Sequence, residues 1–551
     1  MRYKTTDAPR YFHIQHKPPT REIQCKPVKA YLKVLICVLL SALVYIPIIV
    51  SARPVRVGDG SEYYAMAVSW TETHRPYMTA PAWVYYDQLY RSNAIPGISS
   101  GEELKNFSPL LVRGDSQDFN HFWFYSLGAA VLVEIGDYSG VTIPVHTGFM
   151  LLHFLLLAGL LYTCWQYFGW HGLVGAIVLT GLSPALWYVD KVHTEFFTYC
   201  LTSIAVVFFI KKQFPASALF LALAGTQNLS FAAISLAVLG YGIGRPLKTK
   251  VKLTDALLSA GTLIVITLHP LYYLIRFGVV DPQFLAEAAA IGTNLPRFYI
   301  WFLDPDLGLL PNWPLSILLA VFAMWWFVKN WKQTRIREYL FFCLVFVSVS
   351  LLAQSSTINL NSGASPGLAR YATWYIALFF PAILALIYAA EKTDLRLSLL
   401  ILLFVLAGFF SARNYWPWTT NTAHCHPSAA SYWVQKNLPW LYDPPPEVFA
   451  ERYGGVCEII TARKNTAVIG PDCRKVLILN PTAQPEYTIT GAAGCGYDFT
   501  GLLKQHEGDL VGATVAYYHR IFEDLGVRGR VAFHGMDDRS HAYTLLRALA
   551  K

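Results

Sequence analysis

Long apolar runs recur along this chain, and they constrain its fold more than any other feature. A helix needs roughly 20 apolar residues to cross a bilayer. Only 14% of the residues are charged, whereas a soluble protein has about 25%. This pattern predicts one large helical membrane domain instead of several soluble domains. The expected spans fall at 30–51, 145–166, 171–189, 195–210, 214–229, 230–244, 254–276, 313–328, 338–354, 370–390 and 396–412.

A further apolar run, "HFWFYSLGAAVLVEIG" at 121–136, is interpreted differently. It is short, begins with aromatic residues and contains Glu134, which is typical of a helix lying at the membrane interface. With the N-terminus inside and this run not crossing, every clearly basic short gap falls on one side, as the positive-inside rule requires. Those gaps are 211–213, 244–252, 329–338 and 391–396. The net charge of +9 is therefore a topology signal and not a nucleic-acid footprint.

The predicted fold is an all-α polytopic membrane helical bundle of about 11 transmembrane helices, followed by a small α+β extramembrane domain. The expected parts are a basic cytoplasmic arm (1–29), a membrane domain (30–412) with a large first outer loop (52–144), and an outer C-terminal domain (413–551). In the last part, 475–480 and 530–535 look like strands, and 509–524 looks like a helix.

Four cysteines of this outer part predict one or two disulfides in an oxidising compartment. They are Cys425, Cys457, Cys473 and Cys495. Three pairings are possible, and free buried thiols are the alternative. No C-x-x-C pair is present, so the spacing does not match a zinc site.

Two acidic loops are expected on the outer face. "RVGDGSEYYAMA" follows the first span and carries Asp59 and Glu62. "SPALWYVDKVHTEFF" (183–197) carries Asp190, Lys191, His193 and Glu195. Each charged group near the bilayer centre would cost roughly 2.5–3.5 kcal/mol, so this second stretch is predicted to be a tight outer turn. The alternative is that these acids only mark the membrane interface.

Basic and imidazole side chains accompany these acids outside. Arg297 and Arg370 lie at the outer mouths of spans, where a phosphate is a natural bidentate partner for a guanidinium group. Snorkelling to lipid headgroups is the alternative for both arginines. His74 and His121 are expected to be structural or to donate hydrogen bonds, more than to bind metal.

Such a face would suit sugar transfer from a polyprenyl phosphate. The acceptor hydroxyl loses a proton as it attacks the anomeric carbon, so a carboxylate base is required. The leaving phosphate is already a stable anion, so it needs positive charge instead of the carboxylic acid that a glycosidase uses.

The segments "GDGSEYYAMA", "HFWFYSL", "SPALWYVDKVHTE", "FLDPDLGLLPNWP" and "GLARY", in that order, resemble the GT-C superfamily of polyprenyl-phosphate-sugar glycosyltransferases, which includes protein mannosyltransferase-like and aminoarabinose transferase-like enzymes. The resemblance covers about residues 30–412 and rests on order and placement. It implies inverting transfer with Asp59 as base, although Glu62 could share or replace that role. Glu195, favoured over Asp190, would be the second acid.

The same resemblance implies that Arg370 lies near the lipid phosphate, with Lys191 and Arg297 as looser candidates. His74, His121 and His193 are expected to bind substrate. Some members use a divalent cation, for which Asp59 and Glu195 would be the ligands. The expected partners are a polyprenyl-phosphate-linked sugar and a glycan, lipid or protein acceptor, at a bacterial inner membrane with the active site periplasmic or extracellular.

Two other classes of function stay open. One is a polysaccharide polymerase or ligase that uses a pyrophosphate-linked glycan. The other is a transporter or non-catalytic scaffold, against which the conspicuous charges lie at one surface and not at the midplane.

Overall fold

The structure is a computed structural model. It describes residues 29–51, 54–244, 252–285, 289, 291–292, 294–357, 360, 367–418, 426–454, 465–473, 475–479, 487–491, 516–520 and 534–536. The cytoplasmic arm predicted at 1–29 lies outside these residues except for Lys29.

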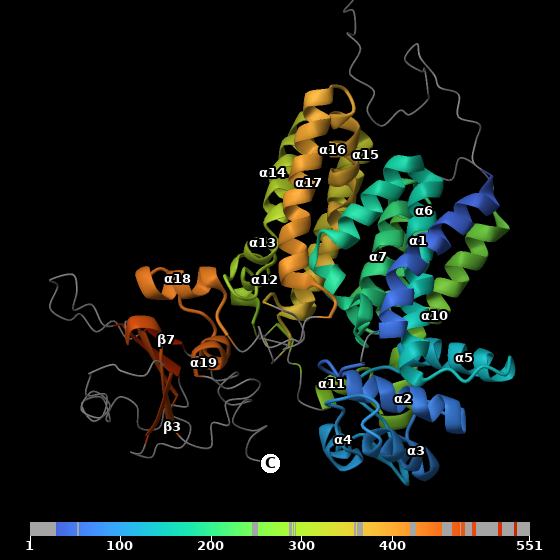
Figure 1. Ribbon diagram of the computed structural model, residues 1–551, viewed down its shortest axis with the longest axis vertical. Helices are drawn as coiled ribbons and strands as arrows, with labels where there is room; N and C mark the ends of the chain where they lie inside the picture. Colours follow the sequence, from blue (N-terminus) through green and yellow to red (C-terminus); the bar gives the residue numbers. More distant parts are fainter. Residues whose placement is uncertain are drawn as a thin grey trace, which may run out of the picture.

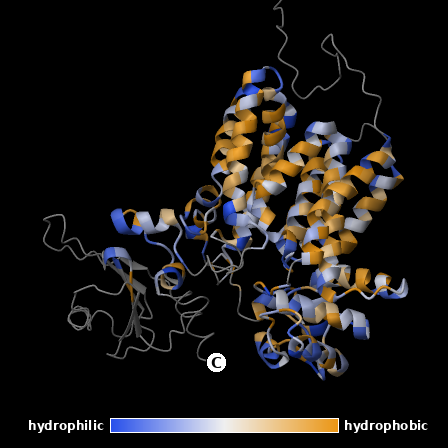
Figure 2. Cartoon of the chain, viewed as in Figure 1, coloured by the Kyte–Doolittle hydropathy of each residue, from blue (hydrophilic) through white to orange (hydrophobic). Residues whose placement is uncertain are grey.

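Apolar helices form the larger part of the molecule (Figures 1 and 2). Six helical segments are long and apolar enough to cross a membrane, and four further apolar helices have 10–17 residues. The six are α1 (Ala30–Ser51), α6 (Val145–Gly181), α10 (Leu253–Phe277), α15 (Thr334–Gln354), the segment Arg370–Ala390, which joins η3 (Arg370–Phe379) to α16 (Phe380–Ala390), and α17 (Asp394–Tyr415). The four are α7 (Thr194–Ile210), α8 (Phe214–Gly225), α9 (Leu229–Ile243) and α14 (Pro314–Lys329).

These helices confirm the predicted helical membrane bundle, while the count of eleven crossings stays a prediction. α6 covers two of the expected spans and contains a break at Gly169, where φ is 63°. A Cβ added at Gly172 would lie 2.1 Å from the carbonyl oxygen of Cys164, although eight residues of continuous helix span about 12 Å. The chain therefore folds back at this break. The second span ends at Gly181 and not at 189, because Pro184 begins the 3-10 helix η1 (Pro184–Asp190).

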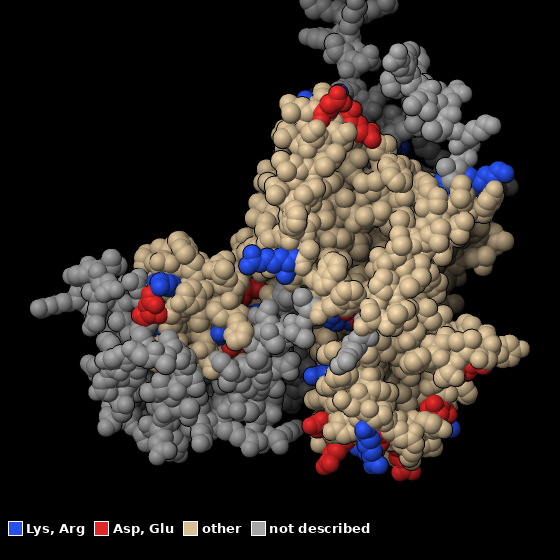
Figure 3. All heavy atoms as spheres, in the orientation of Figure 1, with Lys and Arg blue, Asp and Glu red and all other residues tan. Residues whose placement is uncertain are grey.

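Both the interior and the outer surface of the bundle are rich in apolar side chains. α7 lies inside, and nearly all of its side chains are buried. The outer helices instead present apolar side chains outward, as expected of a lipid-facing surface, and charged residues are scarce on that flank (Figure 3). Examples of exposed apolar residues are Leu43, Ile46, Ile264, Ile275, Met324, Trp325, Leu406 and Phe409.

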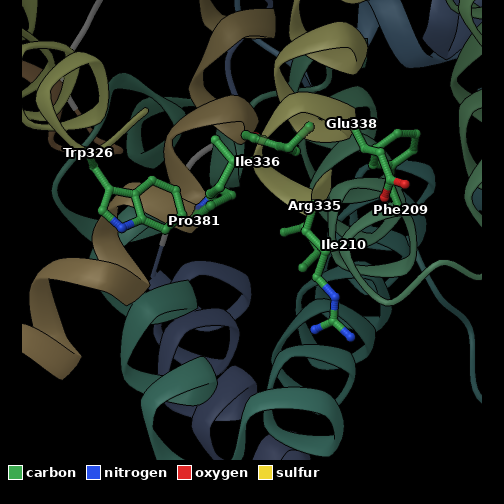
Figure 4. Close-up of a pocket in the computed structure, with 8 residues that line it drawn as sticks. Phe209, Ile210, Trp326, Arg335, Ile336, Glu338 and Pro381 are labelled. Carbon is green, nitrogen blue, oxygen red and sulfur yellow. The ribbon is translucent and has the colours of Figure 1, made fainter. Parts of the chain in front are cut away.

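Three of the short basic gaps, 211–213, 329–338 and 391–396, lie at one end of the bundle, as alternation of the spans predicts, and the gap 244–252 lies almost wholly outside the described residues. Polar contacts join them: Lys33 to Gln166 (3.2 Å), Tyr167 to Gln213 (2.7 Å), His171 to Glu391 (2.6 Å) and Lys212 to Glu338 (3.2 Å). A small crevice opens between α7, α14, α15 and α16 at this end, and Arg335 and Glu338 point to different sides of it (Figure 4).

The segment predicted as the first outer loop folds, over its described residues 54–144, into a lobe at the opposite end of the bundle from these gaps (Figure 1). It contains α2 (Gly60–Thr73), α3 (Ala80–Arg91), α4 (Gly101–Phe107), the two-residue strands β1 (Val112–Arg113) and β2 (Ser116–Gln117), and α5 (Phe124–Tyr138). α5 lies across the end of the bundle instead of running along it, which agrees with its interpretation as a non-crossing helix. Short elements continue this end: α11 (Pro282–Leu285), η2 (Leu295–Arg297), α12 (Ile300–Leu303) and α13 (Leu309–Asn312).

The C-terminal part joins the outer end through α18 (Ala429–Asn437) and α19 (Pro446–Gly454). A five-stranded sheet follows, ordered β5-β3-β4-β6-β7, in which only β3 and β5 pair in parallel. Its elements are β3 (Asn465–Ile469), η5 (Pro471–Cys473), β4 (Lys475–Leu479), β5 (Tyr487–Gly491), β6 (Ala516–Arg520) and β7 (His534–Met536).

β4 coincides with the strand expected at 475–480, and β7 overlaps the one expected at 530–535. The expected helix at 509–524 is wrong, because β6 lies inside it and pairs with β4 and β7. Pairing on both sides overrides a local helical pattern, and Tyr517 and Tyr518 suit a strand. Cys425, Cys457 and Cys495 lie outside the described residues, as does the side chain of Cys473.

Candidate active site

Asp59 immediately precedes α2, and the two glycines beside it allow its segment of the chain to pack closely against the loop that carries Val192. Gly58 has a φ of 49°, a left-handed conformation that glycine adopts without strain. A Cβ on Gly60 would lie 3.3 Å from the carbonyl oxygen of Val192. The first outer loop therefore packs closely against the second. The carboxylate of Asp59 makes no capping hydrogen bond to α2 and turns to other partners.

The second loop supplies His193 and Glu195. η1 ends at Asp190, and α7 begins at Thr194, with His193 in extended backbone between them. Nδ1 of His193 contacts the carboxylate of Glu195, and its Nε2 lies 3.7 Å from the carboxylate of Asp59. Both side chains are almost fully buried, at 1% and 3% exposure.

Arg370 joins the two loops. It begins η3, after a hydrogen bond from the amide of Ala369 to the carbonyl of Leu307 (3.0 Å) fixes the preceding residue. Its Nη1 donates to Asp59 and, at 3.0 Å, to Nε2 of His193. Its Nη2 donates to the hydroxyl of Tyr371 at 3.0 Å.

One polar atom of this arginine is left over. Nε of Arg370 is buried and has no hydrogen-bond partner among the residues that the structure describes. Leaving a buried donor unpaired costs about 1–3 kcal/mol, and more for a charged group. The edge of the guanidinium formed by Nε and Nη2 is the one that matches a carboxylate or phosphate in a bidentate contact.

His121 connects Asp59 to Glu62. Nε2 of His121 lies 3.4 Å from the carboxylate of Asp59, and its Nδ1 lies 2.8 Å from that of Glu62. Because both ring nitrogens face carboxylates, the doubly protonated imidazolium fits the contacts. The ring of Tyr63 packs between the two histidines, at centroid distances of 5.3 Å from His121 and 6.0 Å from His193.

α10 holds the loop that carries His121. The hydroxyl of Tyr273 donates to the carbonyls of Phe119 (2.9 Å) and His121 (3.0 Å). One residue before Phe119 in the chain, the buried carboxylate of Asp118 pairs with Arg276 at 2.6 Å. These contacts fix the backbone around His121.

Six side chains make up what is called the acidic–arginine cluster below: Asp59, Glu62, His121, His193, Glu195 and Arg370. Exposure separates its three carboxylates: the side chain of Asp59 is 28% exposed, against 8% for Glu62 and 3% for Glu195. Asp59 is therefore the carboxylate that a substrate can reach, whereas the other two face histidines.

The charges of the cluster shift its titration. Burial alone would raise the pKa of Asp59, but Arg370, His121 and His193 outweigh it and hold that pKa well below its usual range. For His121, burial lowers the pKa, while Glu62 and Asp59 outweigh burial and leave it raised. These shifts favour an ionised Asp59 and a protonated His121 in the resting cluster.

Four other predicted residues make their polar contacts elsewhere. Lys191 pairs with Asp190 at 2.6 Å and donates to the carbonyl of Pro417, so these two buried residues satisfy each other. Burial raises the pKa of Asp190 to about 6.

His74 is exposed at the C-terminal end of α2, 3.6 Å from Glu134. Arg297 contacts the side chain of Asn294 at 3.4 Å. The structure thus does not bring these four into the cluster.

The two residues expected as ligands of a divalent cation, Asp59 and Glu195, have other partners in the cluster. Asp59 is engaged by Arg370, and Glu195 is engaged by His193. Among the described residues, no group of three or more His, Cys, Asp and Glu side chains could hold a metal ion.

Sequence reasoning missed the supporting residues Tyr63, Tyr273 and Arg276. Tyr63 belongs to the first acidic loop, and its position one residue after Glu62 could have suggested it. Tyr273 and Arg276 lie in α10, more than 150 residues from their partners, and no local pattern connects them.

Comparisons with protein-family models, with curated proteins and with solved structures find no match to this chain. The chemistry of the cluster therefore rests on its geometry. It can accept a proton at one accessible carboxylate, and it can hold an anion at one guanidinium group a few ångströms away.

Proposed function

We propose that this protein is a membrane glycosyltransferase of the GT-C type. It transfers a sugar with inversion from a polyprenyl-phosphate donor to a hydroxyl acceptor, which is a glycan, lipid or protein. The observation that carries the proposal is the contact between Asp59, the accessible carboxylate, and Arg370, whose buried Nε lacks an acceptor in the described structure. A base and an anion-binding group side by side are what this reaction needs.

In the proposed reaction, the oxygen of the acceptor hydroxyl forms a bond to the anomeric carbon, and its proton passes to the carboxylate of Asp59. The bond from the anomeric carbon to the phosphate oxygen breaks, and its electron pair leaves with the phosphate. The guanidinium of Arg370 stabilises this leaving group. Glu62 and Glu195 act through His121 and His193 as positioning residues, because neither carboxylate is accessible.

The placement of the cluster also supports the proposal. It lies where the outer lobe meets the helical bundle, so the headgroup of a lipid in the bilayer can reach it while the tail stays among apolar helices. We further propose eleven crossings, with the cluster and a C-terminal α+β domain on the periplasmic or extracellular side of a bacterial inner membrane. The common end of the basic gaps supports this orientation.

A transfer assay with purified protein tests the function. The donors are a panel of polyprenyl-monophosphate sugars, and the Asp59→Asn variant is compared with the wild type. We expect transfer from a monophosphate donor and a fall of about 10²–10⁴-fold in the variant, the usual contribution of a general base. Glu72→Gln, a charge-removing change elsewhere in α2, is the control. Full activity of Asp59→Asn would overturn the assignment of the base.

The same assay separates the other two classes of function. A polymerase or ligase would consume pyrophosphate-linked oligomers and leave the monophosphate sugars unused. A transporter would move substrate across sealed vesicles without covalent transfer.

A further inference from the structure

The proposed function assigns opposite tasks to two groups that bind each other. Arg370 holds the carboxylate of Asp59, and while it does so it is only partly available to a phosphate. Asp59, in turn, is a weak base while Arg370 keeps its pKa well below the usual range. The resting cluster therefore performs neither task fully.

The net charge of the cluster also opposes the binding of an anionic donor. The cluster contains three carboxylates and two cations, the guanidinium of Arg370 and the imidazolium of His121, so it has an excess of one negative charge when His193 is neutral. Such a site repels an anionic lipid unless one carboxylate loses its hold on Arg370. Asp59 is the one that can, because it is the most exposed of the three and its backbone lies beside Gly58 and Gly60.

We propose that the donor phosphate exchanges with Asp59 on Arg370, so that binding of the lipid phosphate is itself what frees the catalytic base. This inference rests on the proposed function. The phosphate first meets the unpaired Nε and the adjacent Nη2, a bidentate edge that Asp59 does not use. Nη1 then releases Asp59, which keeps its contact with His121.

The exchange has a chemical consequence for the order of events. Once the neighbouring positive charge is neutralised by phosphate, a carboxylate in a partly buried site becomes more basic. Asp59 therefore gains proton affinity only when a donor is bound, and water or acceptor reaching the empty cluster meets a carboxylate that is paired with arginine.

Binding of farnesyl phosphate to the full-length protein in detergent micelles tests the exchange. Removing the competitor should tighten binding, so we expect Asp59→Asn to bind farnesyl phosphate about tenfold more tightly than the wild type, the worth of one charge-assisted hydrogen bond. Glu62→Gln is the matched control: it removes one negative charge from the same cluster but does not touch Arg370. Inorganic phosphate and farnesol distinguish the headgroup from the tail, and Arg370→Met should abolish binding in either background.

Each result of this binding experiment either supports or overturns the exchange. Tightening in Asp59→Asn that clearly exceeds the change in Glu62→Gln supports the exchange. Equal tightening in both variants, or unchanged or weaker binding in Asp59→Asn, overturns it while leaving the proposed function in place. Failure of the wild type and both variants to bind farnesyl phosphate overturns the proposed function itself.

Discussion

Asp59 owes its place to its neighbours in the chain. Gly58 supplies a left-handed turn, and Gly60 lets the start of α2 approach the carbonyl of Val192. A side chain at either position would move the carboxylate or the facing loop. The pattern of an acid between two glycines, which an ordinary exit loop does not need, is thus explained by close packing of two outer loops.

His121 gives the cluster a pH dependence of stability. Its pKa in the folded protein is raised by Glu62 and Asp59, so its charged form stabilises the fold. That stabilisation is complete below its ordinary pKa of about 6.5 and is lost as the pH rises through the raised value. We expect His121→Gln to lower the unfolding temperature most at about pH 6, and by less as the pH approaches about 9. Thermal unfolding in detergent measures this, and a deficit that grows with pH would contradict it.

At the scale of elements, α10 holds the loop of His121 through several contacts, and the hydroxyl of Tyr273 is the one that reaches the carbonyl of His121 itself. Tyr273→Phe removes the hydrogen bonds to the carbonyls of Phe119 and His121, at a stability cost of about 1–3 kcal/mol. The displaced loop should lower the transfer rate at least about tenfold, because catalysis is sensitive to small errors in position. The control is Tyr339→Phe, which removes a hydrogen bond to the carbonyl of Leu378 at the other end of the bundle.

A comparison of both variants by transfer rate and unfolding temperature separates position from stability. If Tyr273→Phe and Tyr339→Phe lose the same amount of activity, α10 does not position the site.

The elements also show what the sequence can predict. Apolar runs and basic gaps predict the helices and the end at which the gaps meet, because hydropathy and charge act over one segment at a time. The same reasoning predicted that Asp59, Glu195 and Arg370 lie on one face of the membrane domain. It favoured Glu195 over Asp190 but kept Asp190 and Lys191 as candidates, since the direction of a side chain in a short turn depends on packing, here of Lys191 against Pro417. It could not foresee β6, which depends on distant strands.

For the whole molecule, the proposed orientation places the outer lobe and the basic gaps on opposite sides of a membrane. Tyr138, at the end of α5, is 97% exposed, and Trp331, in a basic gap, is 53% exposed. In intact spheroplasts, an impermeant maleimide should label Tyr138→Cys at once, and Trp331→Cys only after the membrane is opened. The unsubstituted protein gives the background from native cysteines. Labelling of both sites under the same condition would contradict the topology.

The profile of lipid-linked sugars in cells, read by mass spectrometry, tests the proposed transfer reaction at Asp59 in its natural setting. Cells that lack the protein, and cells that carry only Asp59→Asn at a matched amount in the membrane, should accumulate the same polyprenyl-phosphate sugar, and cells with the wild-type protein should not. A profile in Asp59→Asn cells identical to that of the wild type would contradict the account.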